Sequence, residues 1–244
     1  MTRPLLIMKT GQTLTSLRAS GEDFEDWIIT AMGLPASVTT TVAVHEDEAL
    51  PPLSDIAGIV VTGSPAMLTD AAPWNLVAGD YLLAAVQGEL PVLGICYGHQ
   101  LLAHACGGQV DYHPAGREIG TVPIWLHGDA LDDPLLAGVP VDFVAHATHS
   151  QSVLRLPAAA TLLASSAHDP HHCFRIGEQA WGVQFHPEFT APVMRTYVLE
   201  REEVLREEGM TPEKLLAEVV ETPAATLILR NFARIIGMTP GSGA

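Results

Sequence analysis

The stretch PVLGICYGHQ, residues 91–100, constrains the fold of this chain more than any other. An apolar run leads into Gly94, Cys96 and Gly98, and a helix-forming segment follows over residues 100–105. A thiol between two glycines, at the corner between a strand and a helix, is the pattern of a nucleophile elbow with Cys in place of Ser. Side chains at the glycine positions would collide with the turn, and the corner residue takes a strained backbone conformation. We therefore predict a strand, a sharp turn and a helix, with Cys96 at the corner.

Cys96 is a candidate nucleophile. The N–H groups at the start of the following helix would point at its sulfur and favour the thiolate, which is the reactive form. The alternative is an inert core cysteine, because free cysteines are among the most buried residues.

A second motif, WGVQFHPEF, occupies residues 181–189. A cysteine nucleophile needs a base, and the base needs an acceptor that orients it. His186 and Glu188 are two residues apart, so their side chains point the same way on an extended segment. We predict that Glu188 holds one ring nitrogen of His186 while the other nitrogen reaches the Cys96 thiol.

Together the two motifs resemble the signatures of the class I, or triad, glutamine amidotransferases, G-x-C-x-G-x-Q and H-P-E. The resemblance extends over residues 56–189 and is most marked to the glutaminase half of GMP synthase and to stand-alone proteins similar to it. It implies a glutaminase in which Cys96 is the nucleophile, His186 the base and Glu188 its acid. It also implies flavodoxin-like layering and no metal or organic cofactor.

The rest of the chain predicts an α/β fold with a doubly wound, mostly parallel sheet, because strand-like and helix-like segments alternate. The nucleophile would then lie at the carboxyl end of a strand, where such sheets bind their ligands. The expected strands are 5–8, 38–44, 56–62, 92–95, 119–126, 143–148, 160–166, 174–176 and 180–184, and the expected helices are 23–29, 76–87, 192–207, 212–220 and 224–236. We assign residues 1–190 to the amidotransferase domain and residues 191–244 to a C-terminal helical extension of the same domain.

The composition of the chain excludes some classes of binding partner and indicates a cellular compartment. The formal net charge is −16 and the only lysines are Lys9 and Lys214, which argues against nucleic acid or an anionic membrane as a partner. The sequence has neither an apolar run long enough to cross a bilayer nor a signal-peptide pattern. Three cysteines, one of them a candidate nucleophile, predict a reducing cytoplasm.

The turn at Gly63-Ser64-Pro65 resembles the family's Gly-Gly-Pro loop. The resemblance implies an oxyanion hole made by the backbone N–H groups of Ser64 and Tyr97, with Gly63 beside the substrate. The alternative is an ordinary turn, since Gly-Ser-Pro is common turn chemistry. Serine at the second position would also resist a positive φ that glycine accepts.

The resemblance further implies contacts to the substrate amino acid from Gln100 and from residues 149–151. His149, Ser150 and Gln151 stand where the family has His-Gly-Asp, so Gln151 replaces the aspartate that assists recognition of the substrate amino group in some members of the family. Four possible metal ligands are close together in the sequence: His168, His171, His172 and Cys173. A zinc site needs about four well-placed ligands, usually from two separate segments, and no second segment pairs with this one. We therefore interpret the run as a polar loop.

The predicted reaction is hydrolysis of glutamine to glutamate and ammonia, and a synthetase that uses the ammonia would be a separate chain. The main alternative is a γ-glutamyl peptidase that acts alone on larger γ-glutamyl amides with the same triad. A cysteine variant of the α/β-hydrolases is disfavoured because its acid precedes its histidine, whereas Glu188 follows His186. A non-catalytic regulatory subunit is disfavoured by the intact triad.

Overall fold

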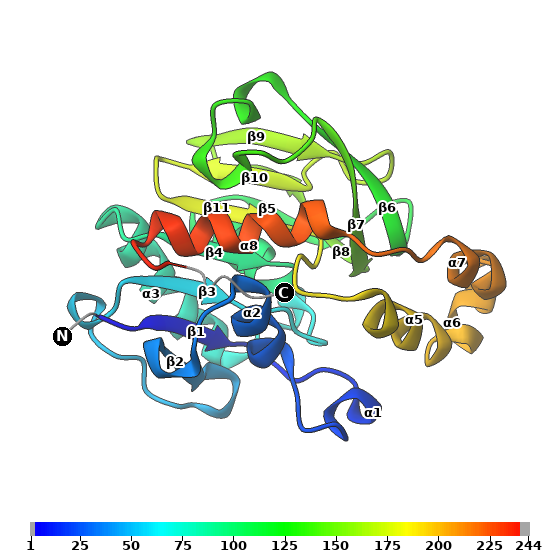
Figure 1. Ribbon diagram of the computed structural model, residues 1–244, viewed down its shortest axis with the longest axis horizontal. Helices are drawn as coiled ribbons and strands as arrows, with labels where there is room; N and C mark the ends of the chain where they lie inside the picture. Colours follow the sequence, from blue (N-terminus) through cyan, green and yellow to red (C-terminus); the bar gives the residue numbers. More distant parts are fainter. Residues whose placement is uncertain (1–2, 240–244) are drawn as a thin grey trace.

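The computed structural model describes residues 3–239, which form a mixed sheet covered by helices (Figure 1). The strand order across the sheet is β2-β1-β3-β4-β11-β10-β9-β6-β7. The strands from β2 to β11 run parallel, and those from β10 to β7 are antiparallel to their neighbours. The strands are β1 (Leu5–Lys9), β2 (Thr39–Ala43), β3 (Gly58–Val61), β4 (Val92–Ile95), β6 (Glu118–Leu126), β7 (Asp142–His149), β9 (Ala160–Ser165), β10 (Cys173–Ile176) and β11 (Ala180–Val183).

Two strands that the sequence did not predict, β5 (Gln109–Tyr112) and β8 (Gln151–Arg155), pair with each other in a separate two-stranded sheet. The helices are α1 (Thr15–Arg18), α2 (Phe24–Met32), α3 (Pro73–Gln87), α4 (Tyr97–Ala105), α5 (Ala191–Leu199), α6 (Glu202–Glu207), α7 (Pro212–Glu218) and α8 (Pro223–Ile235). The predicted single helix over residues 192–207 is wrong, because the chain leaves helical geometry between α5 and α6 and Arg201 becomes the N-cap residue of α6.

Both faces of the sheet are buried, which explains why its central strands are continuously apolar. Along β1, Leu5 and Ile7 face one core cluster while Leu6 and Met8 face the other. Helices α2 and α8 cover the first cluster, and α3 and α4 cover the second. This doubly wound arrangement, expected from the sequence, places the carboxyl ends of β1, β3, β4 and β11 along one edge of the sheet.

The C-terminal helices pack on the rest of the chain in two ways. Helix α8 buries Leu229 and Phe232 in the first core cluster, next to α2. Helices α5, α6 and α7 extend beyond the sheet at one end of the molecule (Figure 1). On these contacts we propose that residues 191–244 belong to the same domain as residues 1–190, although residues 240–244 lie outside the described part.

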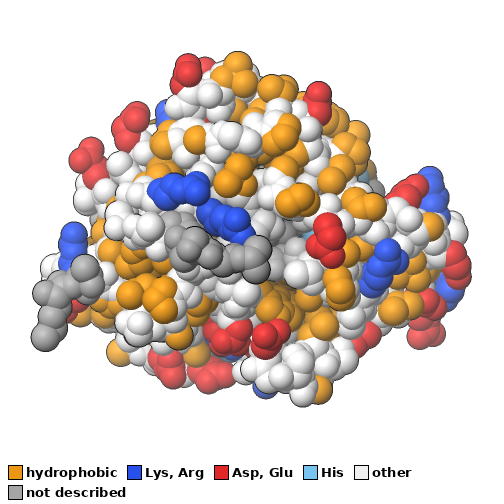
Figure 2. Space-filling model, in the orientation of Figure 1, with side chains coloured by type: hydrophobic (Ala, Val, Ile, Leu, Met, Phe, Trp, Pro, Cys, Tyr) orange, Lys and Arg blue, Asp and Glu red, His pale blue; other side chains and the backbone are white. Residues whose placement is uncertain are grey.

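The surface carries many more acidic than basic side chains, as the net charge requires, and red acidic groups ring the face seen in Figure 2. Within residues 3–239, none of the helices combines the length and the apolar character needed to span a bilayer.

Candidate active site

Cys96 occupies a strained corner between β4 and α4, with φ 51° and ψ −100°. Positions 94 and 98 require glycine because no space is left for a Cβ atom, whereas the φ of neither residue is positive. A Cβ on Gly94 would collide with the backbone carbonyl of Gly98, and a Cβ on Gly98 would come within 2.5 Å of the Val61 carbonyl oxygen. The strand–turn–helix path therefore presents the Cys96 side chain at the sheet edge, with the first turn of α4 directly behind it.

His186 follows β11, the strand next to β4, and is held from several sides. Its Nδ1 lies 2.7 Å from Glu188 Oε1, and its backbone N–H donates to the His146 carbonyl. The ring of Phe189 stacks on the imidazole at 4.0 Å between centroids. A Cβ on Gly63 would lie 2.9 Å from the imidazole Cε1, so Gly63 leaves the space that the ring fills.

These contacts leave His186 Nε2 buried without a hydrogen-bond partner among the described residues. Burial alone would lower the pKa of His186, but the negative charges of Glu188 and Cys96 outweigh it and raise this pKa to about 10. The ring is therefore an imidazolium at neutral pH. A cation beside a cysteine stabilises the thiolate, which is the state that attacks a carbonyl carbon.

Glu188→Gln should lower the rate on the order of 10²–10⁴, because the amide keeps the shape but loses the charge that stabilises the imidazolium. Without that charge the pKa of His186 falls, so the basic limb of the kcat/KM profile should move down from the region of pH 10. The ion pair between the His186 imidazolium and the Glu188 carboxylate also contributes to the free energy of unfolding. This contribution is fully present below the ordinary histidine pKa of 6.5 and is lost as the pH rises through about 10.

The control for this variant is Glu200→Gln, which removes another carboxylate that lines the same cavity without bonding to His186. The measurement is the pH dependence of glutamate release. An unmoved basic limb in Glu188→Gln would mean that another group sets the ionisation of His186.

The predicted oxyanion-hole donors flank the thiol. Tyr97 is the first residue of α4, where a backbone N–H has no partner within the helix. Ser64 lies in the loop after β3, and its hydroxyl donates to the Thr10 carbonyl at 2.8 Å and accepts from Ala66 N–H at 3.1 Å. Its φ is not positive, so serine meets no strain there. The oxyanion role of the Ser64 and Tyr97 N–H groups stays a prediction.

A cavity of about 370 Å³ opens at the thiol. Four of the predicted substrate contacts line it: Gln100, His149, Ser150 and Gln151. Gly63, the fifth, is not among the lining residues and lies against the His186 ring instead. The Gln100 amide, however, donates to the Gln151 carbonyl at 2.7 Å and to Gln184 Oε1 at 3.0 Å. The Gln151 side chain accepts from Leu68 N–H at 2.9 Å and donates to Thr69 at 2.6 Å. Gln151 thus ties the segment after the oxyanion loop to β8, and its contact with substrate remains a prediction.

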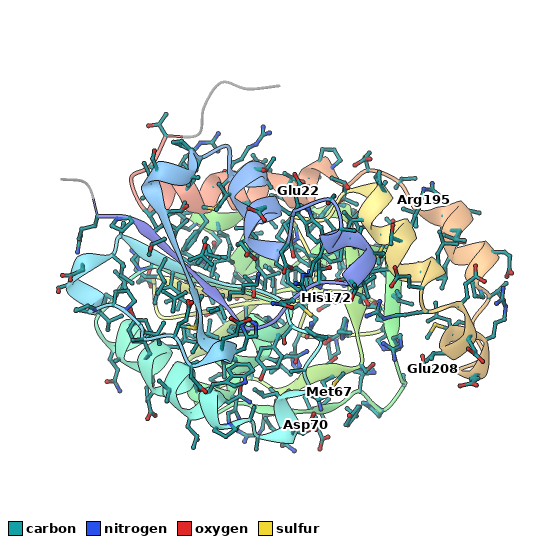
Figure 3. All side chains as sticks on the ribbon, turned by 90° about the horizontal axis from the view of Figure 1, so that it is seen from below. Glu22, Met67, Asp70, His172, Arg195 and Glu208 are labelled. Atoms are coloured by element: carbon teal, nitrogen blue, oxygen red, sulfur yellow. The ribbon has the colours of Figure 1, made fainter. Side chains whose placement is uncertain are left out.

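Sequence reasoning missed Glu118, which organises one end of this cavity. Its Oε2 lies 2.9 Å from His149 Nε2 and 2.7 Å from His172 Nε2, and its Oε1 accepts from the Ser166 hydroxyl. Burial would raise the pKa of Glu118, but its bonds to the two histidines hold this pKa well below its usual range. His172, labelled in Figure 3, is fully buried. The network fixes His149 at the cavity wall.

The run of histidines after β9 does not converge on one point. His168 lies against the Gly116 carbonyl and His171 against the Val153 carbonyl. The polar-loop interpretation holds for these two residues but is wrong for His172 and Cys173, which are buried. Within residues 3–239, the group with ligand atoms close enough for a metal ion is Glu118, His149 and His172, and its hydrogen bonds already satisfy the carboxylate.

The cavity wall also includes residues from the C-terminal helices: Tyr197, Glu200 and Arg201. From the sequence alone, we expect the charges over residues 201–208 to form a solvated face. That expectation fails for Arg201, because the break between α5 and α6 turns it toward the cavity. No sequence pattern signals this break.

Comparison with known proteins identifies the family of the chain. The family model described as glutamine amidotransferase class-I matches residues 21–204. The chain is 37% identical over 137 residues to the glutamine-hydrolyzing GMP synthase of Porphyromonas gingivalis, covering 56% of this chain and 26% of that protein. It is 37% identical over 142 residues to that of Aeropyrum pernix, covering 58% and 25%. The chain thus spans about a quarter of the length of these curated relatives.

Solved structures share the fold over nearly the whole chain. A glutamine amidotransferase from Thermotoga maritima has a TM-score of 0.77 at 21% identity, over 97% of this chain and 99% of its own. A glutamine amidotransferase from Methylobacillus flagellatus has a TM-score of 0.75 at 22% identity, over 100% and 98%.

Proposed function

Because the chain belongs to the class I glutamine amidotransferase family, we propose that it hydrolyses the side-chain amide of glutamine through Cys96, His186 and Glu188. The observation that carries the proposal is a strained thiol at the end of β4 beside a buried imidazolium that a carboxylate holds at 2.7 Å. These are the parts that nucleophilic acyl transfer needs: a nucleophile, its base and the group that orients the base.

The Cys96 thiolate attacks the side-chain amide carbon, and the carbonyl electrons move onto oxygen. The N–H groups of Ser64 and Tyr97 stabilise that oxyanion, and losing one such donor costs about 3 kcal/mol in acyl-transfer enzymes. As the C–N bond breaks, His186 gives its proton to the departing ammonia. A water molecule, deprotonated by His186, then attacks the γ-glutamyl thioester, and the C–S bond breaks to release glutamate and restore the Cys96 thiolate beside the protonated His186.

The relatives named GMP synthase suggest what happens to the ammonia. Since the likeness covers about a quarter of their length, it supports the glutamine-hydrolysing step alone. We propose that the ammonia passes to a synthetase. The same site also fits the alternative of a γ-glutamyl hydrolase, and the position of Arg201 in the cavity wall favours that alternative.

The test is glutamate release by the purified chain with glutamine. Asparagine, one methylene shorter, is the matched control substrate, and its hydrolysis is followed as the release of aspartate. We expect it to react at least about tenfold more slowly, because one missing methylene costs about 1–3 kcal/mol in a substrate pocket. Turnover would exclude a purely regulatory subunit. The absence of glutamate release from glutamine and from every other γ-glutamyl amide would refute the proposed function.

A further inference from the structure

Arg201 places a guanidinium in the wall of the catalytic cavity, and it forms no ion pair with a carboxylate among the described residues 3–239. It is partly buried, and its Nη1 is fully buried with no hydrogen-bond acceptor among residues 3–239. Two other arginines nearby each pair with a carboxylate. Arg117, also on the cavity, makes a two-pronged contact with Glu208 at 2.9 and 3.1 Å. Arg206 pairs with Glu202 and Glu213 on the outer side of the helices.

A shortage of acids does not explain the unpaired cation, because the chain has 28 acidic residues against 12 lysines and arginines. The Tyr197 ring lies under the guanidinium at 4.7 Å, which compensates part of the cost of removing it from water. Burial still lowers the pKa of Arg201 from its ordinary value, and the charge of Arg117 adds to this, although Tyr197 and the nearby Glu200 carboxylate oppose it. A partly buried guanidinium that lines the cavity and forms no ion pair there is prepared for an anion.

A chain of stacked side chains connects the catalytic histidine to Arg201 along the wall of the cavity. His186 stacks on Phe189 at 4.0 Å, Phe189 packs on Tyr197 at 4.9 Å, and Tyr197 lies under Arg201. In acyl transfer the leaving amine must lie next to the group that protonates it, which is His186 in the proposed function. A substituent on that amine would therefore extend toward the wall that Arg201 occupies.

We propose that Arg201 binds a carboxylate on the leaving amine, so that the site also cleaves γ-glutamyl amides of amino acids. The inference rests on the proposed function and extends its substrate class. The chemistry is unchanged: the thiolate forms the γ-glutamyl thioester, the C–N bond breaks, the amino acid leaves with the proton from His186, and water releases glutamate. A cavity of about 370 Å³ is of the size that binds small molecules.

The test compares kcat/KM for γ-glutamylglycine, whose leaving amine carries a carboxylate, with that for γ-glutamylmethylamide, whose leaving amine does not. The wild-type protein should prefer the glycine derivative by roughly tenfold or more, the usual effect of a charge-assisted hydrogen bond. Arg201→Gln should bring the ratio close to one, and Arg201→Lys should retain part of the preference, because it keeps the charge but loses the planar fork.

Arg206→Gln is the matched control, because it removes an arginine from α6, the helix that Arg201 precedes, outside the cavity, and it should leave the ratio as in the wild type. Thermal melting of each variant checks that the fold is kept. An equal fall in kcat/KM for both substrates in Arg201→Gln would overturn the inference. Arg201 would then bind the glutamyl part of the substrate or stabilise the fold.

A wild-type protein that cleaves glutamine but shows no preference for γ-glutamylglycine would also overturn it, while leaving the proposed function intact. If the wild-type protein cleaves no γ-glutamyl compound, the proposed function fails and this inference fails with it.

Discussion

Cys96→Ala should abolish glutamate release, with a loss of activity of at least about a thousandfold, because removing the nucleophile of a catalytic triad usually costs far more than that. Alanine cannot form the thioester, and only residual binding and oxyanion stabilisation remain. The fold should persist, since alanine is smaller than cysteine and the glycines of the elbow are unchanged. The measurement is single-turnover and steady-state glutamate release, with a thermal melt of the variant.

The control is Cys106→Ala, which removes a cysteine one helix length away, at the end of α4 and outside the cavity. Its activity should stay close to that of the wild type. If Cys96→Ala kept activity within about tenfold of the wild type, Cys96 would not be the nucleophile.

Gly94→Ala should be the most damaging small change to the fold and should also remove activity. The added Cβ would collide with the Gly98 carbonyl and would lie 2.7 Å from the backbone nitrogen of His99. Backbone atoms cannot rotate away as a side chain can, so the turn must open. We expect the free energy of unfolding to fall by about 3 kcal/mol or more, which is the upper range for overpacking. Chemical denaturation measures the loss.

Gly128→Ala is the matched control, because a Cβ there meets no atom within 4 Å and its φ is not positive. Its unfolding free energy should change by no more than about 0.5 kcal/mol, as for most surface substitutions. A Gly94→Ala protein as stable and active as this control would contradict a sterically tight elbow.

The sequence by itself determined the parts that depend on short-range geometry. The strand, turn and helix around Cys96 follow from residues adjacent in the chain, because only small residues fit beside a strained corner. The hydrogen bond between His186 and Glu188 joins side chains two residues apart on an extended segment. The alternation of buried strands and helices predicted the doubly wound sheet, and the motifs predicted the family.

The tertiary structure alone decided which distant groups meet at the cavity. Glu118 faces His149 because β6 and β7 pair antiparallel in one register, and a shift by one residue would turn it to the other face. The orientation of Gln151 depends on the pairing of β8 with β5. Arg201 reaches the cavity because the helix breaks between α5 and α6. Strand register and helix breaks are set by packing between segments far apart in sequence, which local patterns do not encode.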